Sequence, residues 1–136
     1  EIDGVLVEGE KLVKLIDYEY GAYNYRGYDI ANHFYECCGF DCNFARYPNK
    51  EKRHAFYTSY LTTANPSYFS NEQFLEGFDD IVLYFTLISN FFWGTWSIVQ
   101  AKASTIDFDY LGYASLRYDA YFEQKKLFYD ESKFEL

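Results

Sequence analysis

The sequence predicts a mainly helical α+β unit, in which one short β-hairpin precedes four or five helices. Two apolar runs near the start flank a turn of the kind that closes hairpins. Farther along the chain, capping residues stand before longer apolar stretches, which is typical of helices. The 136 residues are 49% hydrophobic and contain no repeat or low-complexity segment. We therefore expect residues 1–136 to form a single domain, or the larger part of one.

The expected hairpin opens the chain. Its first arm is the apolar run 5–7, its turn is Glu8–Lys11, and its second arm is the run 12–16, which Asp17 ends. The first arm is short and the chain contains no Met, so we expect a fragment or a processed product. Residues 18–28 are rich in Tyr and Gly without a steady period, which predicts a loop.

Two shorter helices are expected in the middle of the chain. Asp29 stands where an N-cap is needed, before an apolar-rich stretch that Gly39 would end. After a loop, Asn49 should cap a second helix that continues to about Leu61. The residues 62–69 then read as a connection.

Two longer helices are expected in the second half. Ser70 and Gln73 have the capping-box spacing, and their helix should continue to about residue 104, with Gly77 as a candidate break. The last helix should occupy about 109–127, and its final turn carries two lysines, which the helix dipole favours.

The stretch from Ile81 to Ala101 contains no charged residue and is about as long as a membrane span. It also contains several polar residues, such as Asn90 and Gln100. We therefore interpret it as a buried helix that is apolar nearly all round, and we expect no membrane span. A membrane-anchored helical protein is the alternative that this stretch leaves open.

Composition and charge restrict the partners and the compartment. The net charge is −9, so the chain should repel phosphate backbones, and we expect no nucleic acid as a partner. A cationic ligand would be attracted. Three cysteines, Cys37, Cys38 and Cys42, cluster without a second group that would complete a zinc site. No secretory signal opens the chain, so we expect reduced thiols and a cytoplasmic location.

Acidic residues form the first candidate site. Asp17 follows an apolar strand and Glu19 comes two residues later, so both carboxylates would share a face if the strand continued. Such a pair suits Mg²⁺, although two solvated acids would have the same spacing. Asp29, His33 and Glu36 share one face of the next helix. There Asp29 could act as a cap, and Glu36 as a surface acid or as the partner of a cationic ligand.

A pair of tryptophans forms the second candidate site. Trp93 and Trp96 lie about one turn apart, with Gly94 between them. Indole rings bind cations better than other side-chain rings do, at about 0.5–2 kcal/mol each. Gly94 costs a helix about 1 kcal/mol relative to Ala, so we expect it to serve close packing or ligand approach. Packing within a core is the alternative for the tryptophans.

Three ordered blocks resemble the choline/ethanolamine kinase family. The first runs from Ile16 to Glu36 and includes Tyr-Asn-Tyr-Arg-Gly-Tyr-Asp-Ile-Ala-Asn-His-Phe at 23–34. The second is the paired-Trp block 92–100, and the third is 104–122. This resemblance covers nearly the whole chain. It implies a protein-kinase-like fold of which this chain is the C-terminal lobe, with ATP and Mg²⁺ as reactant and cofactor.

The resemblance also implies roles for single residues. Asp17 would hold Mg²⁺ on the nucleotide phosphates, Glu19 would support that metal site, and Asp29 would brace the catalytic loop. The pocket for ethanolamine or choline would consist of one carboxylate and four rings: Glu36, Trp93, Trp96, Tyr113 and, at its mouth, Tyr20. The substrate hydroxyl would then attack the γ-phosphate in line.

The sequence departs from the family pattern in two respects. The catalytic-loop motif, the Gly-rich loop and the nucleotide-binding Lys of the N-terminal lobe are not in this chain. We therefore expect the chain alone to be inactive, as one part of a split enzyme or as a binding or regulatory module with a cation pocket. A homodimer is also compatible with the family.

The second departure concerns the substrate. Many choline-type members carry a Trp where this chain has Cys37, and the loop before Pro48 is short, as in the ethanolamine branch. A primary ammonium can donate hydrogen bonds to Glu36, whereas a quaternary ammonium depends on a full ring of aromatics. This favours ethanolamine slightly, and a further ring from the Phe40–Phe44 loop would admit choline.

Overall fold

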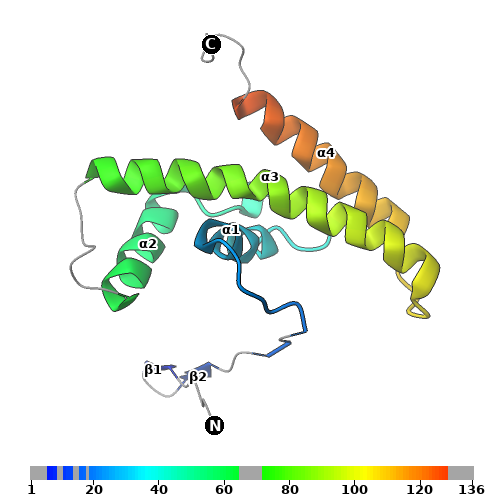
Figure 1. The fold of residues 1–136 in the computed structure, drawn as a ribbon, viewed down its shortest axis with the longest axis horizontal. Helices are drawn as coiled ribbons and strands as arrows, with labels where there is room; N and C mark the ends of the chain where they lie inside the picture. Colours follow the sequence, from blue (N-terminus) through cyan, green and yellow to red (C-terminus); the bar gives the residue numbers. More distant parts are fainter. Residues whose placement is uncertain (1–5, 9–10, 14–15, 18, 65–71, 129–136) are drawn as a thin grey trace.

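The computed structural model describes residues 6–8, 11–13, 16–17, 19–64 and 72–128. Four α-helices dominate this part of the chain, and α3 is the longest of them (Figure 1). Helix α1 crosses the middle of α3, α4 packs along its second half, and α2 makes a smaller contact with its first half. The expected mainly helical unit is therefore what the structure contains.

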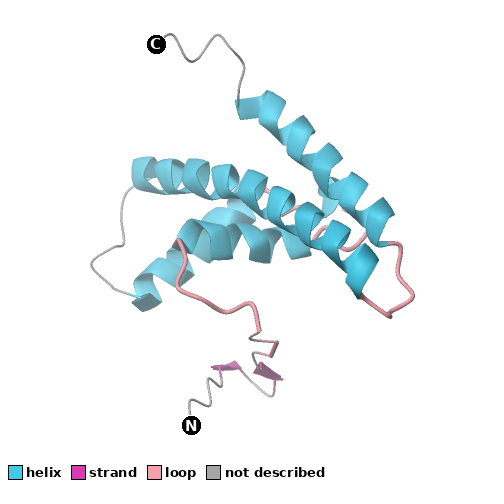
Figure 2. Ribbon diagram, turned by 45° about the vertical axis from the view of Figure 1, so that its right-hand side comes forward, coloured by secondary structure: helices cyan, strands magenta, loops and turns pink. Residues whose placement is uncertain are grey.

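Two short strands lie below the helices in Figures 1 and 2. Strand β1 (Leu6–Glu8) pairs antiparallel with β2 (Lys11–Val13). Residues 9–10 and 14–15 lie outside the described residues, so the predicted hairpin stays a prediction over its turn and the end of its second arm. Ile16 and Asp17 are not in a strand, which corrects the expectation that a strand leads directly into Asp17.

Helix α1 (Arg26–Glu36) begins three residues before the cap that the sequence predicts. Tyr25 precedes the helix, and Asp29 lies in the first turn without capping it. The prediction was wrong because Gly27 was interpreted as part of a loop. Gly27 is buried, and a Cβ at this position would collide with the ring of Phe85 on α3. Close packing of two helices therefore explains the glycine.

Helix α2 (Lys50–Ala64) begins at the cap that the sequence predicts. The Asn49 side chain accepts a hydrogen bond from the amide of Lys52 at 3.1 Å. A 3₁₀ turn, η1 (Phe44–Arg46), lies in the loop before it, and Gly39 adopts a left-handed conformation with φ of 70° at the start of that loop.

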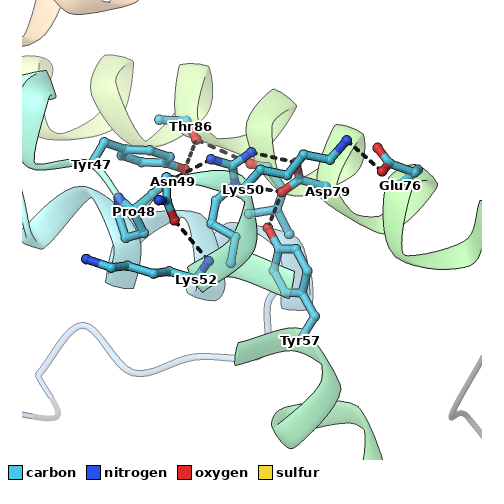
Figure 3. A network of polar contacts seen from close by, with 11 residues as sticks. Tyr47, Pro48, Asn49, Lys50, Lys52, Tyr57, Glu76, Asp79 and Thr86 are labelled. Atoms are coloured by element: carbon cyan, nitrogen blue, oxygen red, sulfur yellow. Dashed lines mark hydrogen bonds and ion pairs between the residues drawn. The ribbon is translucent and has the colours of Figure 1, made fainter. Parts of the chain in front are cut away.

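A buried ion pair joins α2 to α3 (Figure 3). Arg53 donates two hydrogen bonds to Asp79, from Nε at 2.7 Å and from Nη2 at 2.6 Å, and Tyr57 donates a third at 2.7 Å. Burial would raise the pKa of Asp79, but the hydrogen bonds from Arg53 and Tyr57 outweigh it and hold that pKa below its usual value. The carboxylate is thus fully paired.

Helix α3 (Glu72–Ala103) runs without a break past Gly77, where the space around the backbone is open. The capping box that Ser70 would begin lies outside the described residues. Helix α4 (Tyr110–Phe128) starts where the sequence predicts, and Asp109 accepts a hydrogen bond from the Gly112 amide at 2.8 Å. A Cβ on Gly94 would come within 3.1 Å of the Tyr118 ring, so this glycine allows α3 and α4 to pack closely.

By length and composition alone, α3 is the one helix of the described ranges that could cross a membrane. Of its most apolar stretch, 39% is buried inside the protein. A core helix of a folded domain has the same features, and α3 packs against the three other helices. The absence of a membrane span therefore stays a prediction.

Candidate active site

The two acids of the first candidate site lie in the segment that leads from β2 to α1. Asp17 and Glu19 are both exposed, and Glu19 is in a turn rather than on a continued strand. Asp17 has a φ of 62°, a left-handed conformation that costs a residue with a Cβ about 1 kcal/mol. Such conformations persist mainly where the surrounding structure requires them, and they are enriched at functional sites.

The donor set of these acids fits a magnesium ion. Neither carboxylate forms a hydrogen bond or an ion pair with another described residue, and both offer the hard oxygens that Mg²⁺ prefers. Magnesium is usually held by one or two protein carboxylates together with substrate phosphates. In the described part of the chain, no group of three or more acidic, His or Cys side chains could hold a metal on its own. The assignment of Asp17 and Glu19 therefore stays a prediction.

Asp29 is exposed in the first turn of α1, with its carboxylate near the positive end of the helix dipole. The catalytic loop that it would brace is not part of this chain. The role of Asp29 accordingly stays a prediction.

The predicted tryptophans meet the predicted tyrosine at one place. The indoles of Trp93 and Trp96 pack edge to face, with ring centroids 5.3 Å apart and planes at 76°. The Tyr20 ring packs against Trp93 at 5.7 Å, and its hydroxyl accepts a hydrogen bond from Trp96 Nε1 at 2.8 Å. Residues from the loop before α1 and from the end of α3 thus form one aromatic group.

A second set of rings continues this group toward Tyr113. Trp96 packs against Tyr110 at 5.9 Å, and Tyr110 packs against Phe108 at 4.9 Å. Phe108 in turn contacts Tyr113 and Phe40, both within 6 Å. The predicted rings are therefore joined by edge-to-face contacts into what we call the aromatic cluster: Tyr20, Phe40, Trp93, Trp96, Phe108, Tyr110 and Tyr113.

Glu36 places a negative charge beside this cluster. It is the last residue of α1, and its side chain is exposed and pairs with no other described residue. Burial raises the pKa of the Tyr113 hydroxyl, and the charge of Glu36 adds to that rise. The charge of Glu36 is therefore felt at the Tyr113 hydroxyl.

Sequence patterns did not single out Tyr110 and Phe108. They join the two halves of the cluster. Phe108 precedes α4, and Tyr110 is its first residue. Their signal in the sequence is weak because the chain carries 16 Tyr and 14 Phe residues. Asn32, which accepts a hydrogen bond from Trp93 Nε1 at 2.6 Å, was missed because a single amide carries no pattern.

A separate apolar hollow of about 350 Å³ lies between α3 and α4. Five apolar or aromatic side chains line it, namely Tyr84, Leu87, Ile88, Phe91 and Tyr121. It contains no charged residue and none of the predicted site residues, so we place the candidate site at the aromatic cluster instead.

Comparison with known proteins decides the family. The family model for choline/ethanolamine kinases matches residues 4–122. The chain belongs to this family. A probable ethanolamine kinase of Arabidopsis thaliana is 44% identical over 123 residues, which cover 90% of this chain and 33% of the relative. Mouse choline kinase alpha is 43% identical over an alignment of 141 positions, which covers 90% of this chain and 31% of the relative.

The solved structures agree with the sequences. An ethanolamine kinase of Plasmodium vivax superposes with a TM-score of 0.70 at 34% identity, covering 79% of this chain and 28% of that one. The chain, a member of the choline/ethanolamine kinase family, therefore has a kinase-like fold, as predicted. It spans about a third of the length of the curated relatives that it matches.

Proposed function

We propose that the intact protein that carries this chain transfers the γ-phosphate of ATP to the hydroxyl of ethanolamine, and also to that of choline. This would be the first step in the synthesis of phosphatidylethanolamine and phosphatidylcholine. One observation carries the proposal. The two indoles, Tyr20 and Tyr113 belong to a single aromatic cluster, and the charge of Glu36 acts on Tyr113, in a chain of this family.

The cluster suits an ammonium group for two physical reasons. Ring faces attract a cation, most strongly for Trp, and by more when water is excluded. A carboxylate without another partner can accept charge-assisted hydrogen bonds from a primary ammonium, and these are about twice as strong as neutral ones. Glu36, Trp93 and Trp96 would hold the amine, Tyr113 would form a wall, and Tyr20 would close the mouth.

The acidic residues before α1 and in its first turn would act at the phosphate end of the reaction. Bound Mg²⁺ and ATP would supply the transferred phosphoryl group and neutralise its charge. Asp17 and Glu19 would hold that ion, and Asp29 would brace the catalytic loop. Tyr20 connects the two ends, since it follows Glu19 directly and bonds to Trp96. The substrate is thereby oriented with its amine in the cluster and its hydroxyl toward the acids.

Two residues bear on the choice of amine. Cys37 is exposed and contributes no ring, which favours a primary ammonium that Glu36 can bind directly. Phe40 nevertheless brings a ring from the following loop to Phe108 and Tyr113. We therefore propose ethanolamine as the preferred substrate and choline as a second one. The relatives include proteins named for either activity.

Location and partners follow from the same proposal. The three cysteines are free, which agrees with a cytoplasmic site of action. The relatives are about three times as long, so the N-terminal lobe would come from another part of the protein or from a separate polypeptide. A homodimer would be compatible with either arrangement.

The alternative is a catalytically incomplete module that keeps the cation pocket. The experiment supplies ATP, Mg²⁺ and ethanolamine to the intact protein and, separately, to this chain alone, and follows the phosphorylated amine. Product from the intact protein alone supports the proposal. Ethanolamine binding without product in either sample would favour the alternative.

A further inference from the structure

The carboxamide of Asn32 connects the aromatic cluster to the interior of the helices. Its Oδ1 accepts a hydrogen bond from Trp93 Nε1 at 2.6 Å and a second from the Ser89 hydroxyl at 3.0 Å. Ser89 and Trp93 lie one turn apart on α3, while Asn32 is on α1. One oxygen on α1 thus accepts hydrogen bonds from two donors on α3.

The hydroxyl of Ser89 connects Asn32 on α1 to Arg117 on α4. Ser89 is fully buried, and its oxygen accepts a hydrogen bond from Arg117 Nη2 of α4 at 3.1 Å. A serine hydroxyl has a single proton, whereas a guanidinium has donors only. Because Arg117 cannot accept, the Ser89 proton is left for Asn32.

The series of hydrogen bonds starts at Arg117, whose charged side chain is buried. Its side chain is only 1% exposed, and it forms no ion pair with any carboxylate that the structure describes. Its charge lies over the Tyr35 ring, 4.0 Å from the centroid, and 5.7 Å from that of Tyr113. A buried cation costs free energy unless it is well hydrogen-bonded, so its bond to Ser89 restricts both groups.

The direction of donation determines which way the Asn32 amide points. The Ser89 proton requires an acceptor, so Oδ1 rather than the amide nitrogen faces α3. That same oxygen is then available to the indole N–H of Trp93. Without Arg117 and Ser89, one of the two donors that hold Oδ1 toward α3 would be lost, and the Trp93 indole would be held less firmly.

We propose that Arg117, Ser89 and Asn32 form a positioning relay that fixes the indole ring of Trp93 in the aromatic cluster. This inference rests on the proposed function, because it assigns the relay to the pocket for the amine. The three residues act through Trp93 and do not touch the reacting atoms. Arg117 also lies 5.7 Å from the Tyr113 ring centroid, so the same residue contacts one proposed wall of the pocket directly and acts on Trp93 through Ser89 and Asn32.

A double-mutant cycle in the intact protein tests the relay. Ser89→Ala should raise the KM for ethanolamine about fivefold through the lost orientation, with the KM for ATP within about twofold of the wild type. Trp93→Phe keeps a ring but removes the indole N–H. In that background Ser89→Ala should change the KM for ethanolamine by less than about twofold. Ser115→Ala, on the exposed side of α4, is the matched control and should change neither constant.

The cycle separates positioning from general destabilisation. Loss of a partner for buried Arg117 lowers stability equally in both backgrounds, so this effect cancels. Equal fold increases in the wild-type and Trp93→Phe backgrounds, in a protein that does phosphorylate ethanolamine, would overturn the relay and leave the proposed function standing. Absence of any phosphorylation by the wild type would instead count against the proposed function.

A second readout does not depend on turnover. In the intact protein labelled with ¹⁵N-Trp, the indole signal that disappears in Trp93→Phe belongs to Trp93. Ser89→Ala should speed its hydrogen exchange by about tenfold, while the Trp96 indole, bonded to exposed Tyr20, serves as an internal reference. An unchanged Trp93 exchange rate would overturn the relay whether or not the protein is active.

Discussion

The indole N–H of Trp96 donates a hydrogen bond to the Tyr20 hydroxyl at 2.8 Å, across 76 positions of sequence. Tyr20 directly follows Glu19, in the segment that also carries Asp17. The bond therefore ties the segment with the candidate metal ligands to the end of α3, where the aromatic cluster lies. A substrate with an amine at one end and a hydroxyl at the other needs these two parts in a fixed relation.

Trp96→Ala should weaken binding of the amino alcohol selectively. The substitution removes an indole and its bond to Tyr20, so the KM for ethanolamine should rise about tenfold or more while the KM for ATP stays within about twofold. Steady-state kinetics of the intact protein check this. Phe122→Ala, an exposed ring on α4, is the control. Equal increases in both KM values would indicate general unfolding instead of a pocket.

Phe40→Ala should separate the two substrates. A quaternary ammonium depends on ring faces alone, so loss of the Phe40 ring should lower kcat/KM for choline about threefold or more beyond its effect on ethanolamine. Phe44→Ala in the same loop is the matched control, because that ring stacks on Tyr47 at 4.7 Å and not on the cluster. If both variants changed the choline-to-ethanolamine ratio equally, the ring of Phe40 would have no special place in the pocket.

Asp17→Asn should abolish Mg²⁺-dependent transfer while leaving the fold intact. The amide keeps the shape of the side chain but loses the charge that a hard divalent ion requires. The kcat of the intact protein should fall by about a hundredfold or more, with an unchanged thermal midpoint. Asp80→Asn, an exposed acid on α3, should behave as the wild type. A near-normal kcat for Asp17→Asn would rule out the metal assignment.

The Arg53–Asp79 pair should make stability depend on acidity. The folded pKa of Asp79 is lower than its unfolded value, so its contribution is complete above about pH 4 and is lost as the pH falls through the folded pKa. Asp79→Asn should cost about 3–5 kcal/mol at pH 7, because Arg53 stays buried and unpaired.

Thermal midpoints of the intact protein between pH 7 and pH 3 check this. The difference between wild type and Asp79→Asn should shrink toward the acidic end. Replacing both partners, Arg53→Met with Asp79→Leu, should recover most of the loss, since no unpaired charge remains. A difference that is the same at every pH would mean that the charge of Asp79 contributes nothing.

The helices could be predicted from local signals, and their boundaries only in part. Asn49 caps its helix as expected, because a cap depends on a few neighbouring residues. The start of α1 was missed because Gly27 serves a contact with Phe85, 58 positions away in sequence, which no local pattern contains. The strand that was expected to reach Asp17 ends at Val13 as far as the structure describes it.

The same limit applies to the candidate site: local motifs could be recognised in the sequence, and contacts between distant residues could not. The paired tryptophans and Glu36 could be singled out as candidates because they belong to compact sequence motifs, and their roles stay a prediction. Phe108 and Tyr110 could not, since they differ from the other aromatic residues only in what they contact. The relay from Arg117 was invisible for a further reason. It joins α1, α3 and α4 through single hydrogen bonds, so it exists only once the helices are packed.

The most direct test of the account compares three alcohols in one assay with the intact protein, ATP and Mg²⁺. Ethanolamine and choline carry the ammonium that the cluster and Glu36 should bind, whereas 1-propanol has a similar size without the charge. The account predicts phosphorylation of ethanolamine, slower phosphorylation of choline and none of 1-propanol. Phosphorylation of neither amine, or equal phosphorylation of all three alcohols, would contradict it.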